Sequence, residues 1–200
     1  MALGADLLGF NFFQQSKRYI PPAKAAEIIS ELPVFVTSVG IMVSPTLQNV
    51  LELLHICKVD ALQIYEPVDF STSRSIPIPV ISAIRVRQEE PVVNPLPDAQ
   101  LILLDSYSPQ AFGGTGTRLD WRNLPADIPE ERLVLAGGIT PDKVAQLLRV
   151  VRPAVIDVAS GVEKSPGKKD VRKMASLMEA VQKAGLREER FCGTGVLLGF

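Results

Sequence analysis

The chain has 200 residues, 46% of them hydrophobic, and its 21 Lys and Arg residues nearly balance its 22 Asp and Glu residues. This length can bury a sizeable core and favours one domain spanning residues 1–200. A formal net charge of −1 gives no sign of the excess positive charge that is typical of proteins that bind nucleic acid or an anionic membrane. We therefore expect a small-molecule partner, with the chain itself a monomer or homodimer.

Seven short apolar runs, bounded by Gly, Pro or Asp, recur along the chain. Their continuous Val, Ile and Leu content predicts strands buried on both faces, as in a parallel sheet. The runs are Leu7–Phe13, Val34–Val43, Ala61–Ile64, Val80–Val86, Leu101–Leu104, Leu133–Ala136 and Ala154–Val158.

Helical patterns lie between several of these strands. Pro21-Pro22 opens the first, and Ser44-Pro45 and Thr140-Pro141 each supply an N-cap and a first-turn proline to another. Asp170 can cap the last helix, which Gly185 can end. Segments 66–77 and 88–100 have weak helical signals, so any helices there should be short or irregular. The alternation predicts an α/β fold, but periodicity does not decide between an open sheet and a barrel.

The two cysteines, Cys57 and Cys192, lie far apart and form neither a Cys-x-x-Cys nor a Cys/His ligand pattern. Neither a metal site nor a disulfide framework is predicted. No apolar stretch reaches the roughly 18 residues of a membrane helix. The first residues also lack the basic start of a secretory signal, so these features together predict a cytoplasmic protein.

A carboxyl group follows the fifth apolar run directly. Asp105 comes after four aliphatic residues, and in a barrel of parallel strands the reacting groups project from the C-terminal strand ends. Desolvation at the mouth of an apolar core favours the protonated carboxyl, which can act as a general acid. An Asp that caps a turn would show the same pattern.

Glycine-containing turns follow the next two runs. Gly137-Gly138 precedes the expected helix at Thr140, and Ser160-Gly161 follows the last run. Backbone N–H groups left free at such turns bind anions, and barrels often place a phosphate after two consecutive late strands. A tight connection without a ligand remains the alternative for each turn taken alone.

Four motifs in this order and spacing resemble the phosphoribosylanthranilate isomerase family. The resemblance runs from about Ala2 to Gly185 and implies a TIM-type (βα)8 barrel. It also implies a step of tryptophan biosynthesis, the Amadori rearrangement of N-(5′-phosphoribosyl)anthranilate to the 1-deoxyribulose product, with neither metal nor organic cofactor. The motifs are Gly4–Phe10 with Ser16–Ile20, Leu103–Asp105 with Gly113–Gly116 and Asp120-Trp121, Leu135–Pro141, and Asp157–Glu163 with Pro166–Asp170.

The resemblance also implies roles for individual residues. Asp105 matches the general acid that protonates the ring oxygen of the substrate. Arg18, Gln63 and Asp157 match residues that contact the substrate, and Asp157 lies near its anthranilate end. The phosphate loops correspond to Gly138, Ser160 and Gly161.

Two departures from the family pattern stand out. Gln63-Ile64-Tyr65-Glu66 replaces the usual Gln-Leu-His-Gly, so the histidine is lost. The family also begins with a strand ending in a Lys-Ile-Cys-Gly-like motif, whose cysteine is the general base. Here Met1 falls near the end of the following helix, so that first strand is missing at the N-terminus.

The C-terminal segment offers a replacement for that strand. Phe191-Cys192-Gly193-Thr194 echoes the missing motif, and the last helix of a closed barrel leads back to the first strand. We predict that this segment fills the vacant place and that Cys192 is the base, across from Asp105. The alternatives are an apolar tail, a truncated or inactive barrel that binds phosphate without turnover, and another phosphate-binding barrel enzyme.

Overall fold

The computed structural model describes residues 3–65, 74–86, 95–96, 98–106, 120–122, 124–125, 127–184 and 195–199. Within these residues, parallel strands form a closed barrel in the order β1-β10-β7-β6-β5-β4-β3-β2. The barrel strands are β1 (Leu7–Asn11), β2 (Thr37–Val43), β3 (Ala61–Tyr65), β4 (Val80–Val86), β5 (Leu101–Ser106), β6 (Leu133–Leu135), β7 (Val155–Val158) and β10 (Gly195–Gly199). The prediction of a TIM-type barrel is confirmed.

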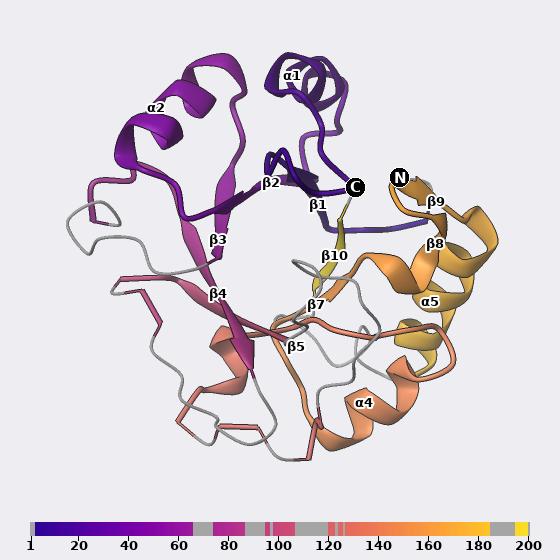
Figure 1. The fold of residues 1–200 in the computed structure, drawn as a ribbon. Coiled ribbons are helices and arrows are strands. Elements are labelled where there is room, and N and C mark those ends of the chain that lie inside the picture. The colour runs from indigo at the N-terminus through magenta and orange to yellow at the C-terminus, as the bar shows by residue number, and fades with distance from the viewer. Residues whose placement is uncertain are drawn as a thin grey trace.

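Helices lie around the outside of the strand ring (Figure 1). They are α1 (Pro22–Ser30), α2 (Leu47–Ile56), α4 (Val144–Val150) and α5 (Val171–Lys183), with 3₁₀ turns η1 (Glu130–Arg132) and η2 (Ser160–Val162). A small hairpin of β8 (Glu163–Ser165) and β9 (Lys168–Lys169) follows η2. No helix in these described ranges is long and apolar enough to cross a membrane.

Two helices begin where the sequence predicts, and two others do not. Pro22 begins α1, and the Asp170 side chain caps α5 by accepting hydrogen bonds from two backbone N–H groups. Ser44 was the wrong cap for α2, because Thr46 forms a reciprocal capping box with Asn49. The start of α4 at Thr140 was also wrong, since a turn occupies residues 141–143 before the helix begins. Of the two segments with weak helical signals, 66–77 and 88–100, residues 66–73, 88–94 and 97 lie outside the described residues.

The C-terminal strand β10 closes the barrel between β1 and β7. Leu197 lies opposite Leu7 on one side and Asp157 on the other, and all three strands run parallel. Asp6 reinforces the junction, because its carboxylate accepts a hydrogen bond of 2.9 Å from the backbone N–H of Val196. The place that the sequence left vacant is therefore filled by residues 195–199.

Alternation along the strands decides which side chains enter the barrel. Successive residues of a strand point to opposite faces, so one set packs outward against the helices and the other fills the interior. In β3 and β5 the inward set ends in polar residues, with Tyr65 and Asp105 above Ala61 and Leu103. The lower interior is apolar, and polar groups gather at the carboxyl ends of the strands.

Candidate active site

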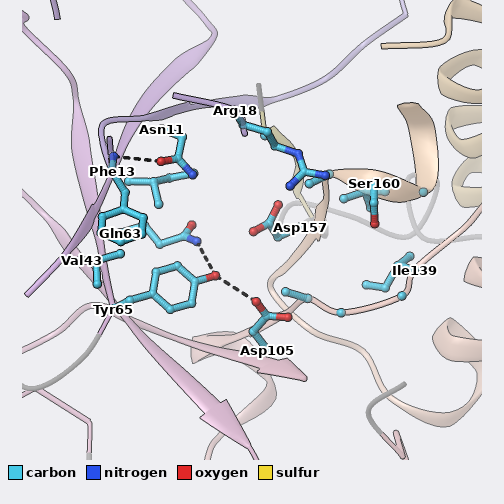
Figure 2. A pocket seen from close by; sticks show the side chains of 18 residues that line it. Asn11, Phe13, Arg18, Val43, Gln63, Tyr65, Asp105, Ile139, Asp157 and Ser160 are labelled. Carbon is cyan, nitrogen blue, oxygen red and sulfur yellow. Dashed lines mark hydrogen bonds between the residues drawn. The ribbon is translucent and has the colours of Figure 1, made fainter. Parts of the chain in front are cut away.

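A pocket lies at the carboxyl ends of the barrel strands (Figure 2). Its walls combine carboxyl and amide side chains from the barrel interior with backbone from two glycine-containing loops. Its lining includes Asn11, Phe13, Arg18, Gln63, Tyr65, Asp105, Gly137, Gly138, Ile139, Asp157, Ser160, Gly161 and Gly199. The structure thus brings together every described residue to which the sequence gave a role.

Asp105 is the most deeply buried carboxyl group in the pocket. It is 3% exposed, and one of its oxygens accepts a hydrogen bond of 3.2 Å from the Tyr65 hydroxyl. Burial raises the pKa of Asp105 to about 6, although hydrogen bonds from Tyr65 and from the Ser106 backbone lower it. At pH 7 a carboxyl group with this pKa is protonated in roughly a tenth of molecules, against about one in a thousand at the ordinary pKa of an aspartate, so Asp105 can act as a general acid.

Asp157 lies between Arg18 and Asp105 in the view of Figure 2. Burial, followed by the negative charge of Asp105, raises the pKa of Asp157 to about 7. Its Oδ1 atom is buried and has no hydrogen-bond partner among the described residues. A buried carboxyl oxygen without a partner is costly, so this atom is positioned to accept a hydrogen bond from a ligand.

Gln63 and Tyr65 form the opposite wall of the pocket on β3. The Gln63 amide N–H donates a hydrogen bond of 3.3 Å to the Tyr65 hydroxyl oxygen. The other end of the amide, Oε1, is buried without a partner in the described part of the chain. Both side chains point inward because they lie two residues apart on one strand.

Arg18 is held by a two-pronged ion pair with Glu163. Its Nε and Nη2 atoms donate to the two carboxylate oxygens at 2.8 and 2.7 Å, and the two side chains are 13% and 4% exposed. Lys169 adds a contact of 3.4 Å to the same carboxylate. The ion pair with Glu163 uses two of the five guanidinium N–H donors, so a ligand can bind Arg18 without displacing Glu163.

Two backbone loops approach each other at the side of the pocket. Gly137 and Gly138 both have positive φ angles, 86° and 69°, which favour glycine. A Cβ atom at Gly161 would lie 1.9 Å from the carbonyl oxygen of Ile139, so glycine is required there. The backbone N–H groups of Gly138, Ser160 and Gly161 have no acceptor among the described residues, which suits them to bind an anion.

Several residues named from the sequence lie outside the described ranges, among them Cys192, Gly185 and the Gly113–Gly116 loop. The residue that β10 brings to the pocket is Gly199, at the carboxyl end of the strand. Cys192 precedes the other end of β10 in the sequence. Its assignment as the base stays a prediction.

The sequence did not assign functions to Tyr65 and Glu163. Tyr65 stands where the family usually has histidine, and its position two residues after Gln63 on one strand predicts that both side chains lie on the same face. Glu163 was part of a motif, but its partner Arg18 lies 145 residues away. No local pattern indicates such a pairing, so the ion pair emerges only from the fold.

An acidic group above an apolar core, facing two loops whose backbone N–H groups have no acceptor among the described residues, is typical of (βα)8-barrel enzymes that act on small phosphorylated molecules. The model of the N-(5′-phosphoribosyl)anthranilate (PRA) isomerase family matches residues 1–180. The chain belongs to this family.

Individual relatives agree with the family match. The chain is 44% identical over 182 residues to the N-(5′-phosphoribosyl)anthranilate isomerase of Geobacter sp. strain M21, covering 90% of this chain and 89% of that protein. Phosphoribosyl anthranilate isomerase from Thermotoga maritima superposes with a TM-score of 0.75 at 34% identity, covering 91% of this chain and 90% of its own. A structure of such an isomerase in complex with reduced 1-(o-carboxyphenylamino)-1-deoxyribulose 5-phosphate superposes with a TM-score of 0.71 at 32% identity and the same coverage.

Proposed function

We propose that this chain isomerises N-(5′-phosphoribosyl)anthranilate to 1-(2-carboxyphenylamino)-1-deoxyribulose 5-phosphate, a step of tryptophan biosynthesis. The observation that carries the proposal is one pocket that holds both the buried acid Asp105 and the unpaired N–H groups of Gly138, Ser160 and Gly161. A phosphate on the loops anchors one end of the substrate. The sugar ring then extends toward the two carboxyl groups.

The reaction divides into ring opening and proton transfer. Asp105 donates its proton to the ring oxygen as the C1′–O bond breaks, while the lone pair of the anthranilate nitrogen forms the C1′=N bond. A base then removes the proton from C2′, which gives an enolamine that rearranges to the C2′ ketone. C1′ is reduced and C2′ is oxidised within one molecule, so we class the enzyme as an intramolecular oxidoreductase of the aldose–ketose type, needing no cofactor as electron acceptor.

The remaining polar groups suit the other end of the substrate. The partnerless Oδ1 of Asp157 is placed to accept a hydrogen bond from the anthranilate N–H group. As a carboxylate, Asp157 would also stabilise the positive charge that develops on this nitrogen when the ring opens. Gln63 offers a second acceptor through Oε1, and Arg18 offers N–H donors to anionic groups of the substrate.

An Asp105→Asn variant tests the acid role. The amide keeps the shape of the side chain but cannot donate the proton, so kcat should fall by at least about 10²-fold with little change in KM. Conversion of aldose to ketose is followed by chromatography. Glu179→Gln is the matched control, because it makes the same chemical change at an exposed carboxylate on α5. An Asp105→Asn enzyme with more than a tenth of wild-type activity contradicts the role.

The same assay separates turnover from binding. If the wild-type chain binds phosphate at the loops but converts no substrate, the alternative of an inactive barrel is correct. We also propose that the enzyme acts in the cytoplasm, because a phosphorylated, carboxylated metabolite does not cross an apolar bilayer unaided. Cell fractionation followed by immunoblotting tests this location.

A further inference from the structure

The arrangement of strands β3, β4 and β5 explains how the Tyr65 side chain reaches Asp105. It ends β3, while Asp105 lies on β5, so strand β4 separates them in the barrel. The β4 residue in register with Tyr65 is Ala83, whose small inward side chain belongs to the interior cluster. The phenol ring can therefore extend past β4 and reach Asp105, as Figure 2 shows.

Gln63 determines the direction of the hydrogen bonds of the phenol. Its amide N–H donates to the hydroxyl oxygen at 3.3 Å, so the single proton of the phenol is directed to Asp105 Oδ2 at 3.2 Å. Tyr65 is buried, 7% exposed, and burial raises its pKa well above its ordinary value. The phenol thus stays protonated and acts as a donor at every pH at which the enzyme works.

We propose that Tyr65 is a positioning residue that fixes the orientation and the acid strength of Asp105. By occupying Oδ2, it leaves Oδ1 as the oxygen that carries the transferable proton. By donating a hydrogen bond to the carboxylate, it stabilises the ionised form and makes Asp105 a stronger acid. This role rests on the proposed function of Asp105 as the acid, and it belongs to the position where the family usually has histidine.

Other groups face Asp105 and set the background against which Tyr65 acts. On β4, Arg85 lies in register with Asp105, and its positive charge lowers the pKa of the carboxyl group, as does the backbone N–H of Ser106. On β7, Asp157 interacts with Asp105 and is itself faced by Lys169 and Arg18. None of these groups is removed by a change at Tyr65, so the effect of the phenol can be isolated.

The test is a Tyr65→Phe variant of the full chain with two readouts. The first is the pKa of Asp105 from its carboxyl ¹³C resonance, assigned with the Asp105→Asn variant. The second is the pH dependence of kcat/KM, which falls as Asp105 ionises. The lost hydrogen bond stabilised the carboxylate. The pKa of Asp105, and the pH at which kcat/KM falls, should therefore both rise by about one unit, which corresponds to the lower end of the free energy of a hydrogen bond to a charged group.

Kinetic parameters add a second expectation. At a pH below the pKa of Asp105 in both wild type and Tyr65→Phe, kcat of the variant should be about tenfold lower with less change in KM. A poorly oriented acid affects the transition state more than it affects substrate binding. Tyr65→His, which keeps a donor, should hold the pKa of Asp105 closer to the wild-type value than Tyr65→Phe does. Tyr19→Phe is the matched control, since it removes a hydroxyl from a side chain that is 37% exposed and does not line the pocket.

The outcomes separate the two proposals. If the pKa of Asp105 in Tyr65→Phe lies within about 0.3 unit of the wild-type value, the positioning role is overturned. An equal loss of activity at all pH values with an unmoved titration also overturns it. If the resonance moves but kcat/KM does not follow, the pairing stands and the acid role of Asp105 fails. Should Tyr65→Phe not fold, the same resonance is followed in Tyr65→Leu, which also removes the donor. An Asp105 titration in that variant within about 0.3 unit of wild type again overturns the positioning role.

Discussion

Gly161→Ala tests whether the two glycine loops form a phosphate site. The added Cβ would lie 1.9 Å from the Ile139 carbonyl oxygen, whereas ordinary van der Waals contact begins near ~3.4 Å. The loops must separate by about 1.5 Å to relieve the overlap. An anion held by N–H groups of both loops at ~2.9 Å cannot keep both sets of hydrogen bonds after such a shift.

The expected loss follows from the hydrogen bonds. One hydrogen bond to a charged group contributes about 1.5–3 kcal/mol, so phosphate affinity should fall about 10- to 100-fold. Overpacking should also lower the unfolding free energy by about 1–3 kcal/mol. Calorimetric titration with inorganic phosphate and thermal unfolding measure the two effects. Gly199→Ala controls for stability, since its Cβ would lie no closer than 3.6 Å to another group. Unchanged phosphate affinity in Gly161→Ala would refute a site between these loops.

Three further changes have defined outcomes. Because the folded pKa of Asp105 lies above its unfolded value, its contribution to stability is present below about pH 4 and lost as pH rises through about 6. Asp105→Asn should therefore have a larger free energy of unfolding than wild type at pH 7.5, by up to about 3 kcal/mol, and should lose this advantage near pH 4. Glu163→Gln should raise KM and destabilise the fold by about 3 kcal/mol, because Arg18 loses its buried counter-charge, as denaturant melts and kinetics would show. Cys192→Ser should abolish turnover without unfolding the chain if Cys192 is the base, and full activity in that variant removes the assignment.

The strands and most helices could be predicted from sequence because their signals are local. Continuous apolar runs mark strands buried on both faces, and Asp170 caps its helix through contacts two and three residues away. The start of α2 was misplaced because Ser44-Pro45 and Thr46 both carry cap signals. The capping box with Asn49 favours the latter.

Closure of the barrel and the details of the site depend on contacts between distant residues. Its position directly after an apolar strand indicated Asp105, whereas Asp157 received its role only from the family resemblance. The hydrogen bond between Tyr65 and Asp105 requires the register of β3, β4 and β5. The ion pair of Arg18 and Glu163 requires two loops from opposite parts of the chain. These pairings follow from the three-dimensional arrangement rather than from any local pattern.

The place of β10 in the barrel has a consequence for synthesis on the ribosome. β1 pairs with a strand that follows every other described element in sequence, and the Asp6–Val196 contact spans 190 residues. At about 5–20 residues per second, β1 waits on the order of ten seconds or more for that partner. During this time the edges of β1 and β7 that β10 later covers stay unpaired, and unpaired edges invite association between nascent chains. We therefore expect the yield of folded enzyme to depend on chaperone supply and on the speed of translation.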